Sequence, residues 1–302
     1  MVGRFRRSLS FPNKINPNRP VAKPPISYHI RSVSLPCRSH PLISQLKDEI
    51  TELKSWVSKP DSRTSSWLCD GLSRLKNVHD YLDDILQLPQ TQETLRQRCQ
   101  SLWVEKLLED FLRFVDVYGI FRTSVLALKE VQSAAQVAMR KRDESKVVSY
   151  VKSRKQMAKE MGKLVSAVRN VRVPARSEPV SVGDAELMGV IGDVIEATVT
   201  VSVSLFNGIS ASFTSRKSSW MGLGLYKKAK KTKVEEGIAE FQQVGVENLW
   251  GLRKKAEDQE VRMALKKMQD MEVCIGDIEN GSERVFRSLI NARVSLLNTP
   301  TQ

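Results

Sequence analysis

The chain has 302 residues, 41% of them hydrophobic, and a formal net charge of +14. A chain of this length and apolar content buries a sizeable core, which excludes a fully disordered protein. The charge favours acidic partners such as nucleic acid, an anionic membrane or a phosphoprotein, without choosing among them. The four cysteines are scattered, without a CxxC pair or a preceding secretory signal, so we expect reduced thiols inside a cell.

Residues 1–40 contain eight Lys or Arg, six prolines and no acidic residue. This composition predicts a disordered basic tail, because the prolines interrupt any helix. An acid-free N-terminus with Arg and Ser is also similar to an organelle transit peptide. We expect an intracellular, cytoplasmic protein, while nuclear, organellar and membrane-peripheral locations stay open as alternatives.

Apolar residues at three- and four-residue steps predict three helices before residue 140. The first begins at Pro41 and ends before Pro60, and the second runs from about Ser65 to Leu86, with Pro89 closing it. The third, from Trp103 to Met139, is apolar on more than one stripe, so we expect neighbouring helices to cover it from several sides. Its main stripe comprises Val104, Leu107, Leu108, Phe111, Leu112, Val115, Tyr118, Val125, Leu128 and Val131. Further apolar residues lie between these, at Phe114, Val117, Ile120, Phe121 and Leu126.

A very basic helix is predicted from about Ser145 to Val171. At about 100° per residue its apolar residues share one arc, and four lysines fall on the opposite side. These are Lys152, Lys155, Lys159 and Lys163. Arg154 lies within the apolar arc, so we expect its side chain to extend out to the solvent.

Prolines in the segment 172–183 break the helical pattern and predict an internal linker. On this interpretation an N-terminal helical part, residues 41–171, is joined to a C-terminal helical part, residues 184–302, that packs on the first. The sequence leaves the oligomeric state open.

The apolar run from Leu187 to Phe206 combines helical spacing with a strand-like alternation at 197–205. We favour a helix, because no second strand is visible to pair with it. Asp193 and Glu196 near the middle of the run argue against a transmembrane span, since each is costly in hydrocarbon.

The closing helix, from about Lys254 to Leu297, carries a seven-residue seam typical of coiled-coil packing. The seam consists of Met268, Met271, Ile275, Ile278, Ser282, Val285, Leu289, Ala292 and Leu296. Gly276 and Gly281 weaken this helix, so we expect bundle packing within the chain and not a free-standing coil. The predicted fold class is all-α, a multi-helix bundle with long antiparallel helices and a disordered basic N-terminal tail.

Four separated blocks of sequence carry a family resemblance. They are RSVSLPCRSHP at Arg31–Pro41, YLDDILQLPQT at Tyr81–Thr91, VDVYGIFR at Val115–Arg122 and ENGSERVFRSLINARVSLLN at Glu279–Asn298. In this order, over residues 31–298, the chain resembles the plant-specific domain-of-unknown-function 241 family, also called BYPASS-related. The resemblance implies a land-plant origin, a role in root and shoot development, and no known enzymatic activity.

The catalytic and phosphate-binding motifs GxxxxGK[ST], HExxH and GxSxG do not occur in the sequence. The histidines and cysteines lack the close ligand pairs that structural zinc needs. Asp80, Asp83 and Asp84 cluster on the second predicted helix, and we interpret them as a solvated face and not as a Mg²⁺ or Ca²⁺ site. We therefore predict a non-enzymatic protein without a catalytic residue, cofactor or metal.

The pattern Arg-Ser-x-Ser-x-Pro occurs twice in the tail and resembles the phosphoserine motif bound by 14-3-3 proteins. Its defining residues are Arg7, Ser10 and Pro12 in the first copy and Arg31, Ser34 and Pro36 in the second. A phosphate on Ser34 or Ser10 adds nearly two negative charges, which suit arginines of the phosphoserine-binding protein. A flexible segment that spans on the order of 25–30 Å lets one dimeric binding protein hold both phosphoserines. The alternative is that the second copy only leads into the first helix.

The lysines support a different function, peripheral binding to an anionic membrane at roughly 1 kcal/mol per charge. A second basic cluster lies near Trp220 and Tyr226. It comprises Lys227, Lys228, Lys230, Lys231 and Lys233. The cluster also fits a nuclear localisation signal or a phosphate contact, but the lack of a base-reading motif disfavours nucleic acid. An ordinary solvated basic face is the remaining alternative.

Overall fold

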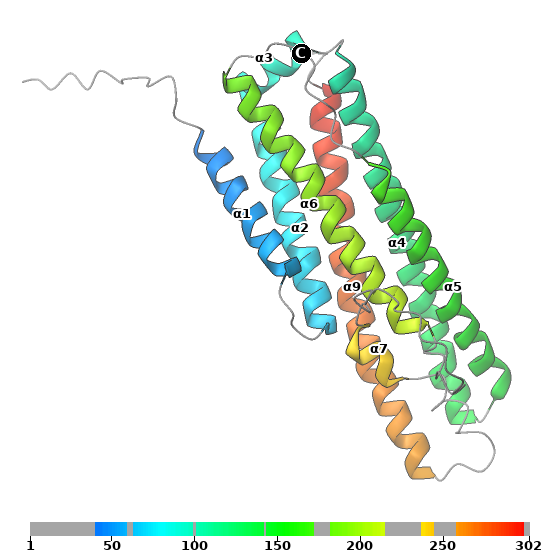
Figure 1. The fold of residues 1–302 in the computed structure, drawn as a ribbon. Coiled ribbons are helices and arrows are strands. Elements are labelled where there is room, and N and C mark those ends of the chain that lie inside the picture. Colours follow the sequence, from blue (N-terminus) through cyan, green and yellow to red (C-terminus); the bar gives the residue numbers. More distant parts are fainter. Residues whose placement is uncertain are drawn as a thin grey trace, which may run out of the picture. The chain divides into compact units, whose positions relative to one another are not determined.

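The computed structural model describes residues 40–58, 63–98, 101–141, 143–171, 182–214, 237–244 and 258–298. Contacts divide the chain into residues 1–38 and 39–302, and the described helices belong to the second unit. Every regular element of the described residues is a helix, which confirms the all-α prediction (Figure 1). The helices are α1 (Pro41–Ser58), α2 (Ser65–Leu86), α3 (Pro89–Gln97), α4 (Leu102–Lys141), α5 (Glu144–Arg169), α6 (Val182–Phe213), α7 (Ala239–Gln243) and α9 (Asp258–Asn298).

Six of these helices pack side by side in the order α1, α2, α9, α4, α5 and α6, and α6 returns to α1. Neighbours α1 and α6 run parallel, as do α2 and α9, while the other neighbours in this order are antiparallel (Figure 1). Helix α6 also contacts α2 across the bundle. The helices on either side of the predicted linker, α5 and α6, therefore lie against each other.

Local sequence explains where several helices begin. Thr64 accepts a hydrogen bond from the backbone N–H of Trp67 at 3.1 Å, and Asp143 accepts one from the N–H of Ser145 at 3.0 Å, so both side chains cap helix N-termini. Pro89 follows the end of α2 as predicted, but it also occupies the first turn of α3, a helix that the sequence analysis missed.

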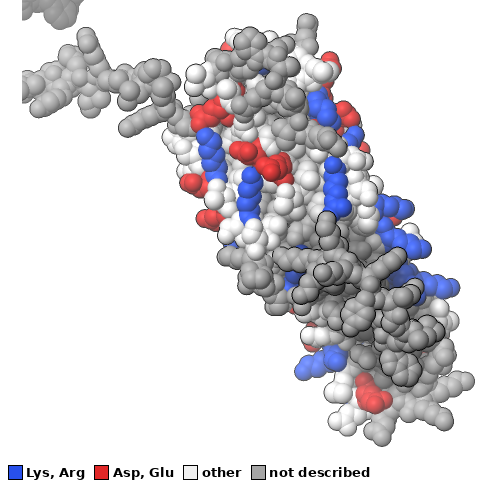
Figure 2. All heavy atoms as spheres, in the orientation of Figure 1, with Lys and Arg blue, Asp and Glu red and all other residues white. Residues whose placement is uncertain are grey.

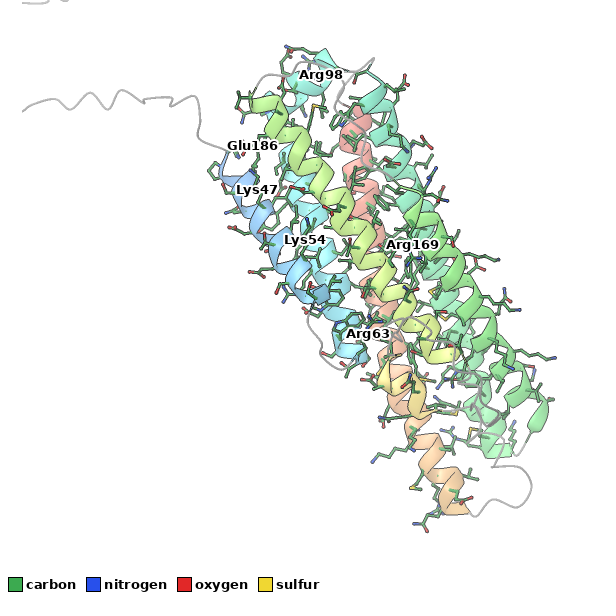
Figure 3. All side chains as sticks on the ribbon, viewed as in Figure 1. Lys47, Lys54, Arg63, Arg98, Arg169 and Glu186 are labelled. Atoms are coloured by element: carbon green, nitrogen blue, oxygen red, sulfur yellow. The ribbon has the colours of Figure 1, made fainter. Side chains whose placement is uncertain are left out.

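Helix α6 is the most apolar of the described helices and packs against α1, α2, α5 and α7. Within the described residues it is the one helix long and apolar enough to cross a membrane by length and composition alone, and 61% of its most apolar 18-residue window is buried inside the bundle. Asp193 and Glu196 lie on its exposed edge. Figure 3 shows Lys47 and Lys54 of α1 beside α6, where they pair with Glu186 at 2.6 Å and Glu196 at 3.1 Å. The helical interpretation of this run is confirmed.

Helix α4 supplies the aromatic side chains that face α6. The ring of Phe206 lies 5.8 Å from that of Tyr118 and 5.1 Å from that of Phe121, and the Tyr118 hydroxyl is 2.9 Å from the hydroxyl of Ser202. Burial raises the pKa of Tyr118, so its hydroxyl stays protonated and available for this hydrogen bond. The long core helix was thus predicted correctly.

The expectation that α4 is covered from several sides is wrong for two of the apolar residues named above. Leu112 is 41% exposed and Ile120 is 44% exposed, although the main stripe residue Phe111 is fully buried. The reason is geometric, because α5 and α9 flank α4 and no described helix packs over the side that faces away from α6.

Helix α9 lies between α2 and α4, and every residue of its predicted seam is buried. Two hydroxyls of α9 join it to α2. Ser288 donates to Asp80, and Ser295 donates to Asp83 at 2.5 Å. Two of the three carboxylates interpreted as a solvated face, Asp80 and Asp83, therefore also link parallel helices, while Asp84 is exposed.

At Gly281, α9 packs tightly against α2. A Cβ atom built there would lie 3.0 Å from Cδ1 and 3.3 Å from Cβ of Leu72, a side chain with no exposed surface. At Gly276, five residues earlier on the same helix, a Cβ atom would meet nothing within 4 Å. The two glycines, which look alike in the sequence, therefore differ in function.

We predict that Gly281→Ala destabilises the protein by about 1 kcal/mol or more, because Leu72 has no room to yield and α9 must move away from α2. Gly276→Ala is the matched control and should stabilise by about 0.5–1 kcal/mol through helix propensity alone. Urea unfolding of the purified variants measures both. Equal and favourable effects at the two positions would contradict the close contact.

Candidate functional site

The predicted lysine stripe of α5 lies on the surface. Lys152, Lys155, Lys159 and Lys163 are all exposed, and the apolar arc opposite them is buried against α4 and α6. Lys163 pairs with Glu160 at 3.1 Å, whereas the other three form no ion pair with a described residue. Figure 2 shows Lys and Arg side chains in a row along the edge of the bundle where α5 lies. We call these four residues the lysine stripe.

The other predicted basic and phosphorylation sites lie outside the described residues. They are the Lys227–Lys233 cluster and, in the tail, Ser10 and Ser34 with their flanking Arg7, Pro12, Arg31 and Pro36. Much of the net charge lies there too, because residues 1–39 contain eight basic and no acidic residues and residues 215–236 contain seven against two. Among the described helices α5 is strongly basic, with seven basic and two acidic residues.

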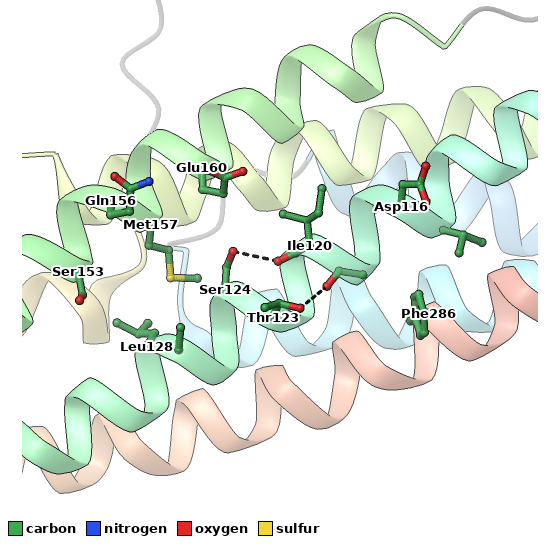
Figure 4. Close-up of a pocket in the computed structure, with 13 residues that line it drawn as sticks. Asp116, Ile120, Thr123, Ser124, Leu128, Ser153, Gln156, Met157, Glu160 and Phe286 are labelled. Atoms are coloured by element: carbon green, nitrogen blue, oxygen red, sulfur yellow. Dashed lines mark hydrogen bonds between the residues drawn. The ribbon is translucent and has the colours of Figure 1, made fainter.

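A groove of about 760 Å³ runs beside the lysine stripe, between α4 and α5 (Figure 4). Leu128 of α4 and Met157 of α5 are buried, while Ile120 of α4 stands exposed in the groove. Phe286 of α9 lies at one end of the groove, where the guanidinium of Arg122 is 5.6 Å from its ring. We call this feature the α4–α5 groove. One feature of the sequence indicates this groove, namely the apolar residues of α4 that lie off the main stripe.

The polar groups of the groove offer little to a small polar ligand. Thr123 and Ser124 donate their hydroxyl hydrogens to the carbonyls of Gly119 and Ile120 on their own helix, each at 2.9 Å (Figure 4). The carboxylate of Glu160 is held by Lys163. The surface that is left is chiefly apolar, with short side chains on the α4 side that allow another backbone to approach closely.

Arg154 behaves differently from the prediction. Its side chain is only 2% exposed and does not extend to solvent. It donates to the backbone carbonyls of Phe241, at 2.6 Å, and of Val244, and its guanidinium lies 4.7 Å from the ring centroid of Phe213. Burial lowers the pKa of Arg154 from its ordinary value. The prediction failed because the segment of α7 and Val244, which supplies these acceptors, was not recognised in the sequence.

Arg154 thereby fixes residues 237–244 against the bundle. Glu240 of this segment accepts hydrogen bonds from the backbone N–H and the hydroxyl of Ser65, both at 2.8 Å, at the start of α2. The N–H of Ile238 donates to the hydroxyl of Ser212 at 2.6 Å, near the end of α6. The segment thus joins α2, α5 and α6, which is a structural role.

His79 of α2 is fully buried between α2, α4 and α6 and is also structural. Thr198 donates its hydroxyl hydrogen to the Val194 carbonyl at 2.7 Å, so its oxygen is free to accept from Nε2 of His79 at 3.1 Å. Nδ1 of His79 then carries no proton and has no partner among the described residues. Burial lowers the pKa of His79 to about 4.

The described residues contain no group of three His, Cys, Asp or Glu side chains arranged to hold a metal ion. Two of the four cysteines are described, Cys69 and Cys274, and both are free thiols. Burial raises the pKa of Cys69 to about 11, so its thiol remains protonated near neutral pH.

A family model described as Protein BPS1, of a plant-specific family, matches residues 71–299. The chain belongs to the BPS1 family. The match covers the bundle from Gly71 in α2 to the end of α9, including both walls of the α4–α5 groove, and three of the four resembling blocks. The Arg31–Pro41 block lies outside it. BPS1 proteins are regulators of plant development. No curated protein and no solved structure matches the chain.

We predict that the free energy of unfolding falls as the pH is lowered from about 6.5 to about 4. In this window the unfolded chain protonates His79 and the folded chain does not, so stability is lost as pH falls, by about 3 kcal/mol at most. His79→Gln, which keeps a donor for Thr198, removes this term. Urea unfolding of both proteins across pH 4–7 measures the difference, and parallel curves would contradict the prediction.

Proposed function

We propose that this BPS1-family protein is a non-enzymatic regulator of root and shoot development that acts in the cytoplasm by binding other proteins. Family membership supports the developmental role, and the resemblance of its sequence blocks supports the root and shoot assignment. The α4–α5 groove supports protein binding, because an apolar surface of this size on a folded bundle is typical of an interaction site.

The N-terminal tail is the proposed switch. The observation that carries this proposal is the repetition of one motif, around Ser10 and around Ser34, in a segment without a single acidic residue. A phosphate on either serine would be the strongest negative charge of the tail and suits an arginine-lined reader of the 14-3-3 type. Two sites on one tether would bind a dimeric reader more tightly than either alone.

We predict that the tagged protein purified from plant cells brings down 14-3-3 proteins, and that phosphatase treatment releases them. The double substitution Ser10→Ala and Ser34→Ala should abolish the association, and each single substitution should weaken it about tenfold or more through loss of avidity. Ser27→Ala with Ser39→Ala, at two serines of the tail outside both motifs, is the matched control. Retention of 14-3-3 proteins by the double variant at positions 10 and 34 would contradict the assignment.

A second candidate function is electrostatic contact with an anionic membrane through the lysine stripe. It is favoured by the exposure of four lysines on one side of α5, three of which lack an ion pair with a described residue. The buried apolar arc of α5 cannot enter a bilayer while the bundle is folded. The contact would therefore rest on charge and weaken with salt.

We predict that, if this second function holds, the protein sediments with vesicles that contain phosphatidylserine and is released by raising the salt from about 0.1 M to about 0.5 M. Glu substitutions at Lys152, Lys155 and Lys159 should abolish most of the binding. The matched control places Glu at Arg262, Lys266 and Lys267, three exposed cations of α9. Equal binding by the two variants would exclude the lysine stripe as the contact.

A further inference from the structure

The α4–α5 groove and the lysine stripe form one continuous surface. Groove residues Ser153, Gln156 and Glu160 lie on the same exposed side of α5 as the stripe. At about 100° per residue, Lys163, Lys152 and Lys159 lie within about 60° of Gln156, on the side away from the core. The lysines therefore form a basic rim along one edge of an apolar groove.

We propose that this surface binds a helix of another protein, amphipathic and with acidic residues along one flank. The apolar side of such a helix would lie on Ile120, Leu128 and Met157, with anchors spaced at i, i+3 or i+4, and i+7. Its acidic flank would face Lys152 and Lys159, which have no ion pair with a described residue. This interaction is separate from the tail and does not require phosphoserine.

The shape of the groove suits a helix. Its α4 wall runs from Val115 to Leu128, about 20 Å at 1.5 Å per residue, which matches three to four turns of a bound helix. Gly119, Thr123 and Ala127 present short side chains on this wall, so the backbone of the guest can approach closely. Ile120 then projects into the contact as the central apolar anchor.

Charge selects this guest over the other occupants. The chain's own segments 1–39 and 215–236 are strongly basic and would face a basic rim. A second copy docked groove to groove would bring two lysine stripes together. Like charges placed face to face oppose both of these contacts. An anionic bilayer would meet the lysine stripe but would not fill the groove, because the apolar surface of the groove is concave.

Asp116 favours one orientation of the bound helix in the groove. It is exposed on the α4 wall, opposite the basic rim on α5, and Figure 4 shows it toward the Phe286 end of the groove. The bound helix is therefore expected to carry acidic residues on its α5 side and a basic or neutral residue near Asp116. Exposed ion pairs add little energy, so the apolar anchors supply most of the affinity and the charges set specificity and association rate.

The test begins with a photo-crosslinking residue placed at Ala127, on the groove wall, in the full-length protein expressed in plant cells. Val273 of α9, 67% exposed and away from the groove, is the control position. After irradiation, mass spectrometry identifies the attached peptide. A synthetic copy of that peptide is then bound to the purified full chain and followed by fluorescence anisotropy.

With the crosslinker at Ala127, we expect an attached partner segment that has helical apolar spacing and an excess of acidic residues. With the crosslinker at Val273, we expect that this segment is not attached. Ile120→Glu should weaken binding of the peptide about tenfold or more, and Lys152→Glu with Lys159→Glu should weaken it several-fold and reduce its salt dependence. Val273→Glu and the pair Lys266→Glu with Lys267→Glu are the matched controls and should leave binding unchanged.

Four outcomes would overturn the proposal: attachment only to lipid, attachment only to residues of this chain, a basic or non-helical partner segment, or no product at Ala127. Binding that survives Ile120→Glu would overturn it as well. The variant Ser10→Ala with Ser34→Ala, tested beside these, separates the groove from the tail, because the groove contact should persist when the 14-3-3 association is lost.

Discussion

Helix α6 carries four acidic residues, no lysine or arginine, and a surface that is apolar on most sides. In water such a helix is stable only when other elements enclose it, because each fully buried Leu, Ile or Phe side chain contributes roughly 1.5–3 kcal/mol. Helices α1, α2 and α5 pack against it, and the aromatic side chains of Tyr118 and Phe121 in α4 contact its Phe206. Two carboxylates near its middle, Asp193 and Glu196, lie on its exposed edge.

Enclosing α6 determines what the bundle shows to its surroundings. Helix α5 turns its apolar arc inward, which leaves the lysine stripe outside, and α4 turns Tyr118 and Phe121 inward, which leaves Ile120 outside. The groove and its basic rim thus follow from the same packing that forms the core. Arg154 shows the converse, because a cation on the buried arc is retained where the carbonyls of residues 241 and 244 accept its hydrogen bonds.

Much of the fold could be predicted because burial follows the helical period. The bounds of α2, the seam of α9 and the lysine stripe each rest on regular spacing, which the packed structure repeats. The helical period of the apolar residues in α4 does not show which of its apolar stripes a neighbouring helix covers. Ile120 was therefore expected to be buried, although it is exposed. Arg154, His79 and the contact at Gly281 depend on partners 87 to 209 residues away in sequence, and no local pattern reveals them.

Helix α6 is enclosed by its neighbours, and the outer sides of α4 and α5 face the surroundings. Hydrogen–deuterium exchange of the full chain tests this arrangement, since amides in the core open only with the whole protein. This arrangement predicts that amide exchange is slowest in residues 190–209 and becomes faster only toward the ends of α6. Fast exchange throughout α6, or an α6 protected only when detergent or lipid is present, would contradict it.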